Sequence, residues 1–265
     1  MALLNVEKLS TLTERNIHLR HYKLRSMAEQ EVIKHTKKVF GIWKTNNPIW
    51  HKISEFLLEI FIIIFAITIS IYFHDRSVLK HQRHETKEFL LGLKQDLTTD
   101  IEEMNQDKSS FIQSEKAFHY ITSRKIGEPL NADTIRKYNG YIFNTTGLVP
   151  NSGRFEGFKS AGKIGTIENK ELQNNILDLY QENIPNLINS TNFYTSKKLG
   201  LFEYVNMNRK RITDSTSNLV SVLSSDPVYN ICVSLTFVQE ILNRYDTCIN
   251  KMNRIISDIN DQYGH

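Results

Sequence analysis

Residues 226–263 read DPVYNICVSLTFVQEILNRYDTCINKMNRIISDINDQY. Apolar side chains recur in this stretch at alternating steps of three and four residues, a spacing that aligns them along one side of an α-helix. The pattern predicts a single long helix, with Asp226 as its N-cap and Pro227 at its first position. Eleven residues form this C-terminal apolar stripe: Val228, Ile231, Leu235, Val238, Leu242, Tyr245, Ile249, Met252, Ile256, Ile259 and Tyr263.

The C-terminal stripe is broader than the contact face of a two-stranded coiled coil. Cys232, Ile241 and Ile255 widen it, which favours packing within a helical bundle. Cys232 and Cys248 are sixteen residues apart, which corresponds to about 24 Å along one continuous helix. That separation is too large for a disulfide, so both cysteines are predicted to be small core residues.

A second long helix is predicted over residues 76–125, which contain no proline. Asp100, Asp107 and Ser114 occupy alternate heptad positions, so its apolar stripe is weaker than the C-terminal one. Gly92 is the residue that most disfavours this helix. The apolar residues recur mainly every seventh position: Leu90, Leu97, Met104, Phe111 and Phe118, assisted by Leu93, Ile101 and Ile121.

A third helical stretch is predicted over residues 169–205, with a kink at Pro185. Short helices are expected over residues 132–143 and 154–161. The apolar face of the third stretch consists of Leu172, Ile176, Leu179, Ile184, Leu187, Tyr194 and Leu201.

Composition agrees with a helical fold. Hydrophobic residues make up 40% of the 265, while eleven glycines and five prolines argue against a loop-rich chain. The predicted fold class is all-α, with one N-terminal transmembrane helix continuous with an elongated antiparallel extracytoplasmic helical bundle.

The transmembrane helix is predicted from an apolar run near residue 60. No charged residue occurs over residues 60–73, and the run reaches back to Phe56 with Glu59 as its one interruption. Eighteen residues correspond to about 27 Å of helix, close to the thickness of a hydrocarbon core. The predicted membrane-spanning residues include Ile60, Ile64, Thr68 and Tyr72.

The orientation of the span follows from the distribution of charge. Residues 1–54 hold ten Lys or Arg against four Glu, whereas residues 75–265 hold twenty-three basic and twenty-three acidic residues. The positive-inside rule therefore places the N-terminus in the cytoplasm and the large domain in the periplasm of a bacterial inner membrane. The formal net charge of +4 is then no indication of a nucleic-acid partner, because the excess basic residues lie beside the membrane, where anionic lipid attracts them.

Three segments result: a basic cytoplasmic arm (1–54), a transmembrane helix (55–75) and a periplasmic helical bundle (76–265). Within the arm, apolar residues recur at helical spacing among lysines, which favours an amphipathic helix on the inner leaflet. The alternative is a basic flank that serves orientation alone. The residues of this stripe are Val32, Ile33, Thr36, Val39, Phe40 and Trp43.

Patterns of known chemistry are weak in this sequence. Gly157 and Gly162-Lys163 nearly match a phosphate-binding loop, but Ile164 replaces the residue that holds magnesium. His74, His81 and Glu88 share a helix stripe, for which a solvated polar face is the simpler interpretation. The sequence thus predicts no catalytic residue, no cofactor and no metal, and the chain is expected not to be an enzyme.

A possible interaction motif lies between the short helix at 154–161 and the helix that starts after Asn169. Gly162 suits the left-handed position that ends a helix, and Asn169 suits an N-cap. The motif can be a structural corner pinned into the bundle or a loop that reads a ligand. Its residues are Phe155, Phe158, Gly162, Ile164, Asn169 and Tyr180.

Several short segments are similar to a family of unknown function, made up of single-pass inner-membrane envelope proteins typical of Bacteroidota. They are EI at 59–60 before an Ile-rich span, FHDR at 73–76, KEFL at 87–90 and FEGFKSAGKI at 155–164. The chain departs from the family at Leu58, where glycine is usual, and at residues 72–75. The resemblance covers roughly residues 35–205 and implies an envelope location without an established activity.

These features together predict a non-enzymatic periplasmic subunit or scaffold, anchored in the membrane, that binds other envelope proteins. The partners are expected to be the lipid bilayer and other membrane or periplasmic proteins, in a larger complex or a homo-oligomer. The alternative is a sensor domain that relays ligand binding through its membrane helix to a partner.

Overall fold

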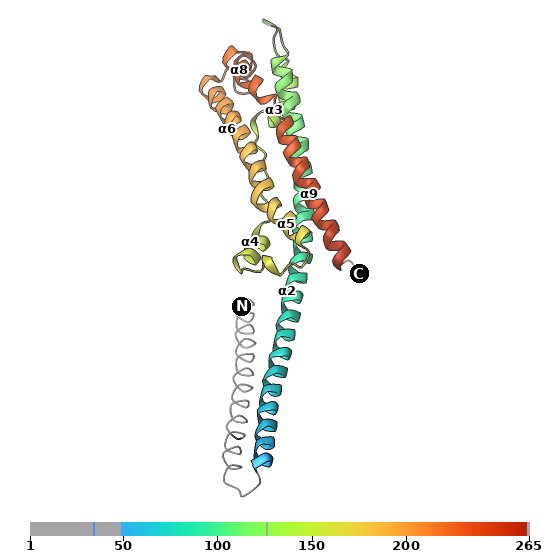
Figure 1. Ribbon diagram of the computed structural model, residues 1–265. Helices are drawn as coiled ribbons and strands as arrows, with labels where there is room; N and C mark the ends of the chain where they lie inside the picture. The colour runs from blue at the N-terminus through green and yellow to red at the C-terminus, as the bar shows by residue number, and fades with distance from the viewer. Residues whose placement is uncertain (1–33, 35–48, 126, 264–265) are drawn as a thin grey trace. The chain divides into compact units, whose positions relative to one another are not determined.

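The computed structural model describes residues 34, 49–125 and 127–263 (Figure 1). The predicted amphipathic helix of the arm lies outside these residues, apart from Lys34. The described chain is all-helical, and its β-structure is limited to an isolated antiparallel bridge between Arg211 and Ser217. The elements are α2 (Ile49–Thr122), α3 (Ala132–Phe143), α4 (Gly153–Ser160), a 3₁₀ turn (Ile164–Thr166), α5 (Lys170–Asp178), a π turn (Leu179–Asn183), α6 (Ile184–Asn208), α7 (Leu219–Leu223), α8 (Asp226–Leu235) and α9 (Gln239–Tyr263).

The chain divides into two units, residues 1–81 and 82–265. In the first unit, α2 is long and apolar enough to cross a membrane: an 18-residue window has a mean hydropathy of 2.5 and is 6% buried. Ile60, Ile64 and Tyr72 expose 37%, 58% and 53% of their surface. The Thr68 hydroxyl donates to the Ile64 carbonyl at 2.8 Å, which satisfies its polar group within the helix.

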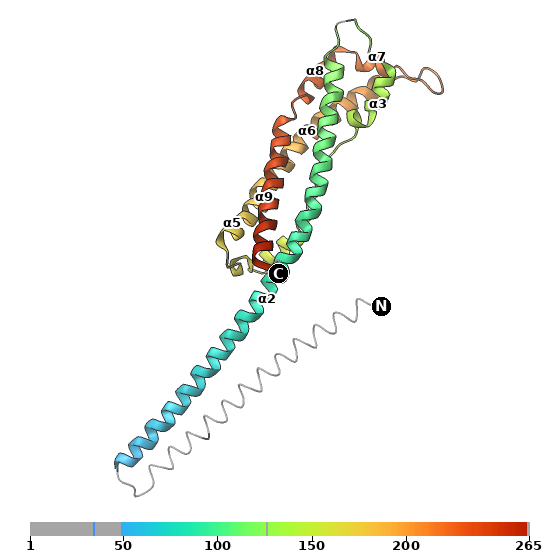
Figure 2. The same cartoon turned by 90° about the vertical axis from the view of Figure 1, so that its right-hand side faces the viewer.

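In the second unit, α9 lies beside α2 and runs in the opposite direction (Figures 1 and 2). Lys94 Nζ donates to Asn260 Oδ1 at 2.6 Å, and Lys108 pairs with Asp246 further along both helices. The predicted apolar residues of α2 are buried, except for the half-buried Ile101, and the ring of Phe111 lies 5.9 Å from that of Tyr245. We call residues 82–263 the helical domain.

The C-terminal helix is not continuous, contrary to the prediction from its periodicity. It is divided into α8 and α9, and residues 236–238 between them are not helical. The Thr236 hydroxyl bonds the Val233 carbonyl at 2.8 Å, competing with the helical pattern. Tyr194 donates its hydroxyl to the Leu235 carbonyl at 3.1 Å, which satisfies a carbonyl that the helix end leaves open.

The break leaves the C-terminal stripe intact, because all eleven of its residues are buried or half-buried. Ser225, not Asp226, is the N-cap of α8, so Asp226 and Pro227 lie one position later than predicted. Cys232 and Cys248 are free and buried, although the premise of one helix was wrong. Burial raises the pKa of Cys232 to about 12 and that of Cys248 to about 11, so both stay protonated near neutral pH.

The third predicted stretch is helical, with its irregularity just before Pro185. The backbone makes a π turn at Leu179–Asn183, and the N–H of Ile184 bonds the Leu179 carbonyl five residues back. A π turn contains one residue more than the corresponding turn of an α-helix. Pro185 follows it directly, and proline has no N–H to donate to an α-helical hydrogen bond.

Candidate functional site

The corner predicted as a possible interaction motif has the backbone expected of it. Gly162 has φ of 70°, its N–H bonds the Lys159 carbonyl at 2.9 Å, and the Lys163 N–H bonds the Phe158 carbonyl at 3.1 Å. These two bonds form a Schellman motif that ends α4. Asn169 caps α5 by accepting from the N–H groups of Glu171 and Leu172. The cap positions predicted from the sequence are thus confirmed.

The side chains of this corner pack against other residues of the domain. Phe155 is fully buried and stacks on Tyr180 with ring centroids 4.3 Å apart. Phe158 stacks on Phe89 of α2 at 3.9 Å, and Ile164 is 9% exposed. The contacts support the structural interpretation of the motif, while its role in binding a ligand stays a prediction.

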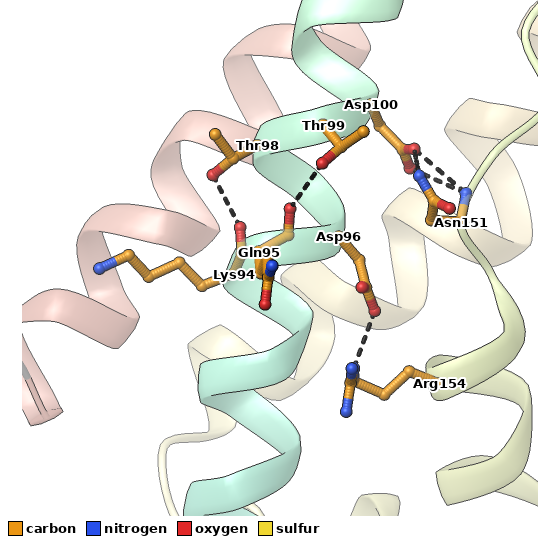
Figure 3. A network of polar contacts seen from close by, with 8 residues as sticks. All are labelled: Lys94, Gln95, Asp96, Thr98, Thr99, Asp100, Asn151 and Arg154. Atoms are coloured by element: carbon orange, nitrogen blue, oxygen red, sulfur yellow. Dashed lines mark hydrogen bonds and ion pairs between the residues drawn. The ribbon is translucent and has the colours of Figure 1, made fainter.

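An extended segment ahead of α4 is fastened to α2 by carboxylates (Figure 3). Asp100, fully buried, accepts from the Asn151 backbone N–H at 3.1 Å and from its Nδ2 at 2.6 Å. Glu103 accepts from the Val149 N–H at 3.1 Å. Burial raises the pKa of Asp100, and the hydrogen bonds from Asn151 act against that rise.

Gly92 has a physical explanation in the same place. Arg154 donates through Nε to Asp96 Oδ2 at 2.8 Å (Figure 3). A Cβ atom on residue 92 would lie 2.3 Å from the Cζ of Arg154. The glycine that disfavours α2 therefore leaves room for the Arg154 guanidinium to cross the helix.

The remaining polar positions of the α2 stripe also have specific partners. Asp107 accepts from the Tyr245 hydroxyl at 2.9 Å, and burial raises the pKa of Asp107. Ser114 donates to the Tyr141 carbonyl at 3.0 Å. The weaker stripe predicted for α2 is thus a set of polar contacts that fix other segments to it.

A buried lysine, which the sequence analysis did not single out, joins α6 to the end of α3. Lys198 is 5% exposed, and its Nζ donates to the carbonyls of Tyr141 at 2.7 Å and Asn144 at 2.5 Å. Burial lowers the pKa of Lys198 to about 8. Because these carbonyls lie at the C-terminal end of α3, they favour a cation there.

A groove of about 660 Å³ lies among α6, α8 and α9. Two phenylalanines that line it, Phe193 and Phe237, are 65% and 75% exposed. The Lys197 ammonium lies 4.6 Å from the centre of the Phe193 ring, and Arg244 pairs with Glu240 at 2.7 Å. Single exposed apolar residues are common, but two large rings beside one concavity are typical of a binding surface.

The groove depends on the break between α8 and α9. Phe237 belongs to the non-helical residues 236–238, and its neighbour Val238 is fully buried. The periodicity of the C-terminal stripe conceals this break, so the sequence did not predict the groove. An aromatic residue outside the stripe, at Phe237, was the one available indication.

A second concavity, of about 840 Å³, lies between the turn after α2 and the segment around α7. Ile121, Leu130 and Val220 supply apolar walls, and Arg124, Lys125 and Ser221 supply polar ones. Arg124 is paired with Glu128 and donates to the Tyr120 hydroxyl at 2.8 Å.

The chain matches no protein-family model, and no curated protein or solved structure shows significant similarity to it. The resemblance to envelope proteins of unknown function therefore stays a prediction.

Proposed function

We propose that this chain is a non-enzymatic periplasmic subunit or scaffold, anchored in the inner membrane, that binds other envelope proteins through the groove among α6, α8 and α9. The helical domain is proposed to be an elongated antiparallel bundle outside the cytoplasm. The N-terminus is proposed to lie in the cytoplasm because the basic residues are concentrated ahead of the span.

The observation that carries the proposal is the pair of exposed rings in the groove. Phe193 and Phe237 expose 65% and 75% of their surface to water, and covering such rings is a main source of affinity in protein interfaces. Among the described residues, Lys197 beside them makes no ion pair. The proposed partner segment therefore presents an apolar side chain to the rings and a carboxylate to Lys197.

The span supports the anchored part of the proposal. Most of its large apolar side chains over residues 53–73 are exposed, with Phe61 at 64% and Phe73 at 65%, which suits a hydrocarbon environment. Neighbouring transmembrane helices can pack on the same surface, so the span can contribute to partner binding as well as anchoring.

A sensor domain is the second candidate, and the concavity of about 840 Å³ beside α7 favours it. This volume is within the range of small-molecule sites. A sensor would pass ligand binding through α2 to a cytoplasmic partner. A small molecule that co-purifies with the chain and is lost when Val220 is changed to tryptophan would favour the sensor over the scaffold.

Photo-crosslinking tests the groove directly. We expect p-benzoylphenylalanine at position 237 to capture a discrete envelope protein in cells, because the partner covers that position in the complex. The matched control carries the same residue at Glu102, which is exposed on α2. Equal capture from both positions, or none from 237, would contradict the proposed groove.

Topology is tested separately. A reporter active only outside the cytoplasm is expected to be active when fused after His265 and inactive when fused before Met1. The reverse pattern would overturn the periplasmic location of the domain, independently of the groove.

A further inference from the structure

A short hairpin between α6 and α7 projects from the helical domain (Figure 2). Its arms are joined by the Arg211–Ser217 bridge and by the Asn218 N–H, which donates to the Lys210 carbonyl at 3.1 Å. At its turn, the hydroxyls of Thr213 and Thr216 lie 2.6 Å apart. The hairpin is therefore held by its own hydrogen bonds, although residues 206–216 are all exposed.

Three consecutive cations dominate the hairpin. Arg209, Lys210 and Arg211 stand against a single acidic residue within residues 204–225, Asp214. Arg211 Nη2 pairs with Asp214 at 2.5 Å, and both side chains are largely exposed, at 76% and 98%. An ion pair so exposed to water contributes little, so the hairpin offers a positive surface.

Large apolar side chains flank these cations on both sides. Met207 is 79% exposed and Ile212 is 67% exposed, against an expectation that such residues are covered. Met207 is the penultimate residue of α6, and Ile212 follows directly after Arg211. Segments that bind in the headgroup region of a bilayer typically combine basic residues with exposed apolar ones.

We propose that this hairpin binds a lipid surface that carries anionic headgroups, as a contact separate from the apolar span of α2. The cations meet the headgroup phosphates, and Met207 and Ile212 enter the boundary with the acyl chains. Charge complementarity selects an anionic surface, and the hairpin projects from the domain (Figure 2), so a flat surface can reach it. The proposal does not depend on the groove among α6, α8 and α9.

The position of the hairpin within the domain makes this contact useful. It lies beside the turn that follows Thr122, since Ile212 and Lys125 line the same concavity. The helical domain begins at Gln82, so about 60 Å of α2 separates that residue from Thr122. The hairpin therefore lies at the end of the domain that is remote from Gln82, its first residue.

Vesicle capture by the full chain tests the proposal. The chain is held in nanodiscs of phosphatidylcholine and mixed with vesicles of phosphatidylcholine alone or with added phosphatidylglycerol. We expect flotation with the anionic vesicles alone, and weaker capture as ionic strength rises. Equal capture by both kinds of vesicle, or capture by neither, would overturn the proposal.

Substitutions then locate the contact. R209Q/K210Q/R211Q should lower the apparent affinity for anionic vesicles on the order of 100-fold, because each of the three cations contributes a similar share of the attraction to the anionic surface. M207S/I212S should lower it at unchanged charge. The matched control, R136Q/K137Q/K159Q, removes three exposed cations elsewhere and should bind like wild type.

Two results would contradict the assignment even if vesicles are captured. One is a control variant that loses as much binding as the hairpin variant, which would indicate diffuse electrostatics. The other is a chain that binds poly-glutamate through the hairpin but does not bind anionic vesicles, which would indicate an acidic protein partner. Wild-type circular dichroism and melting of each variant show that the substitutions leave the fold intact.

Discussion

The two parts of α2 use apolar residues in opposite ways. In residues 53–73 the large side chains are exposed around the helix, as Leu58 illustrates at 60%. In residues 89–118 most of them lie along one side and are buried, as Leu97 illustrates at 0%, and Leu91 is the exception at 40%. The first part is long and apolar enough to cross a membrane, whereas the second part packs on other helices, as Phe111 does on Tyr194 of α6 and Tyr245 of α9. The same helix therefore carries two kinds of sequence because its two parts face different surroundings.

A matched pair of leucine substitutions should separate the two parts most clearly. Leu97→Ala should destabilise the helical domain by about 2–5 kcal/mol, because it leaves a cavity in a packed core. Leu58→Ala should leave the unfolding of the domain unchanged. Denaturant unfolding of the detergent-solubilised chain, followed by near-ultraviolet circular dichroism, measures both. Equal destabilisation would show that the two parts do not differ as described.

Polar contacts distinguish the second part further, and Asp100 is the strongest of them. Asp100→Ala should cost about 2–3 kcal/mol, because the Asn151 N–H and amide lose a charged acceptor in a buried position. Hydrogen exchange around residues 149–151 should accelerate. Glu102→Ala, on the exposed side of α2, is the control. Unchanged exchange would mean that Asp100 does not hold this segment.

Lys198 predicts a dependence of stability on pH. Its pKa is lowered to about 8 in the folded chain from about 10.4 when unfolded, so the unfolded state binds more protons between these values. Stability should rise by about 1–2 kcal/mol from pH 8 to 9.5. Lys198→Met should flatten this rise in urea titrations at each pH. A variant with the wild-type slope would refute the assignment to Lys198.

Gly92 should give the smallest effect and the sharpest double-mutant cycle. Gly92→Ala should change stability by less than about 0.5 kcal/mol, because the gain of about 1 kcal/mol in helix propensity is offset by displacement of Arg154. In an Arg154→Ala background the same substitution should stabilise by about 1 kcal/mol. Identical effects in the two backgrounds would show that Arg154 does not require the glycine.

Local patterns allowed much of the helical structure to be predicted. Residues 132–143 are α3 as expected, and Asn169 and Gly162 have their predicted cap roles. These features depend on neighbours within a few residues, where sequence spacing determines geometry. The orientation of the span and the proposed partners are not local in this sense, and they stay predictions.

Contacts distant in sequence could not be predicted in the same way. The break after Leu235 depends partly on the Tyr194 hydroxyl, 41 residues away, and Asp100 meets a residue 51 positions later. A spacing of three and four residues continues across residues 236–238 whether or not the helix does. The groove arises at that break, so the candidate site was missed together with it.

The π turn at Leu179–Asn183 limits how the length of this chain can vary. Removing one residue there would restore an ordinary α-helix and rotate everything after it by about 100°. Leu187, Tyr194 and Lys198, all buried in α6, would then turn away from the core together. Homologues that share this fold should therefore keep a constant number of residues from Asn169 to Lys198.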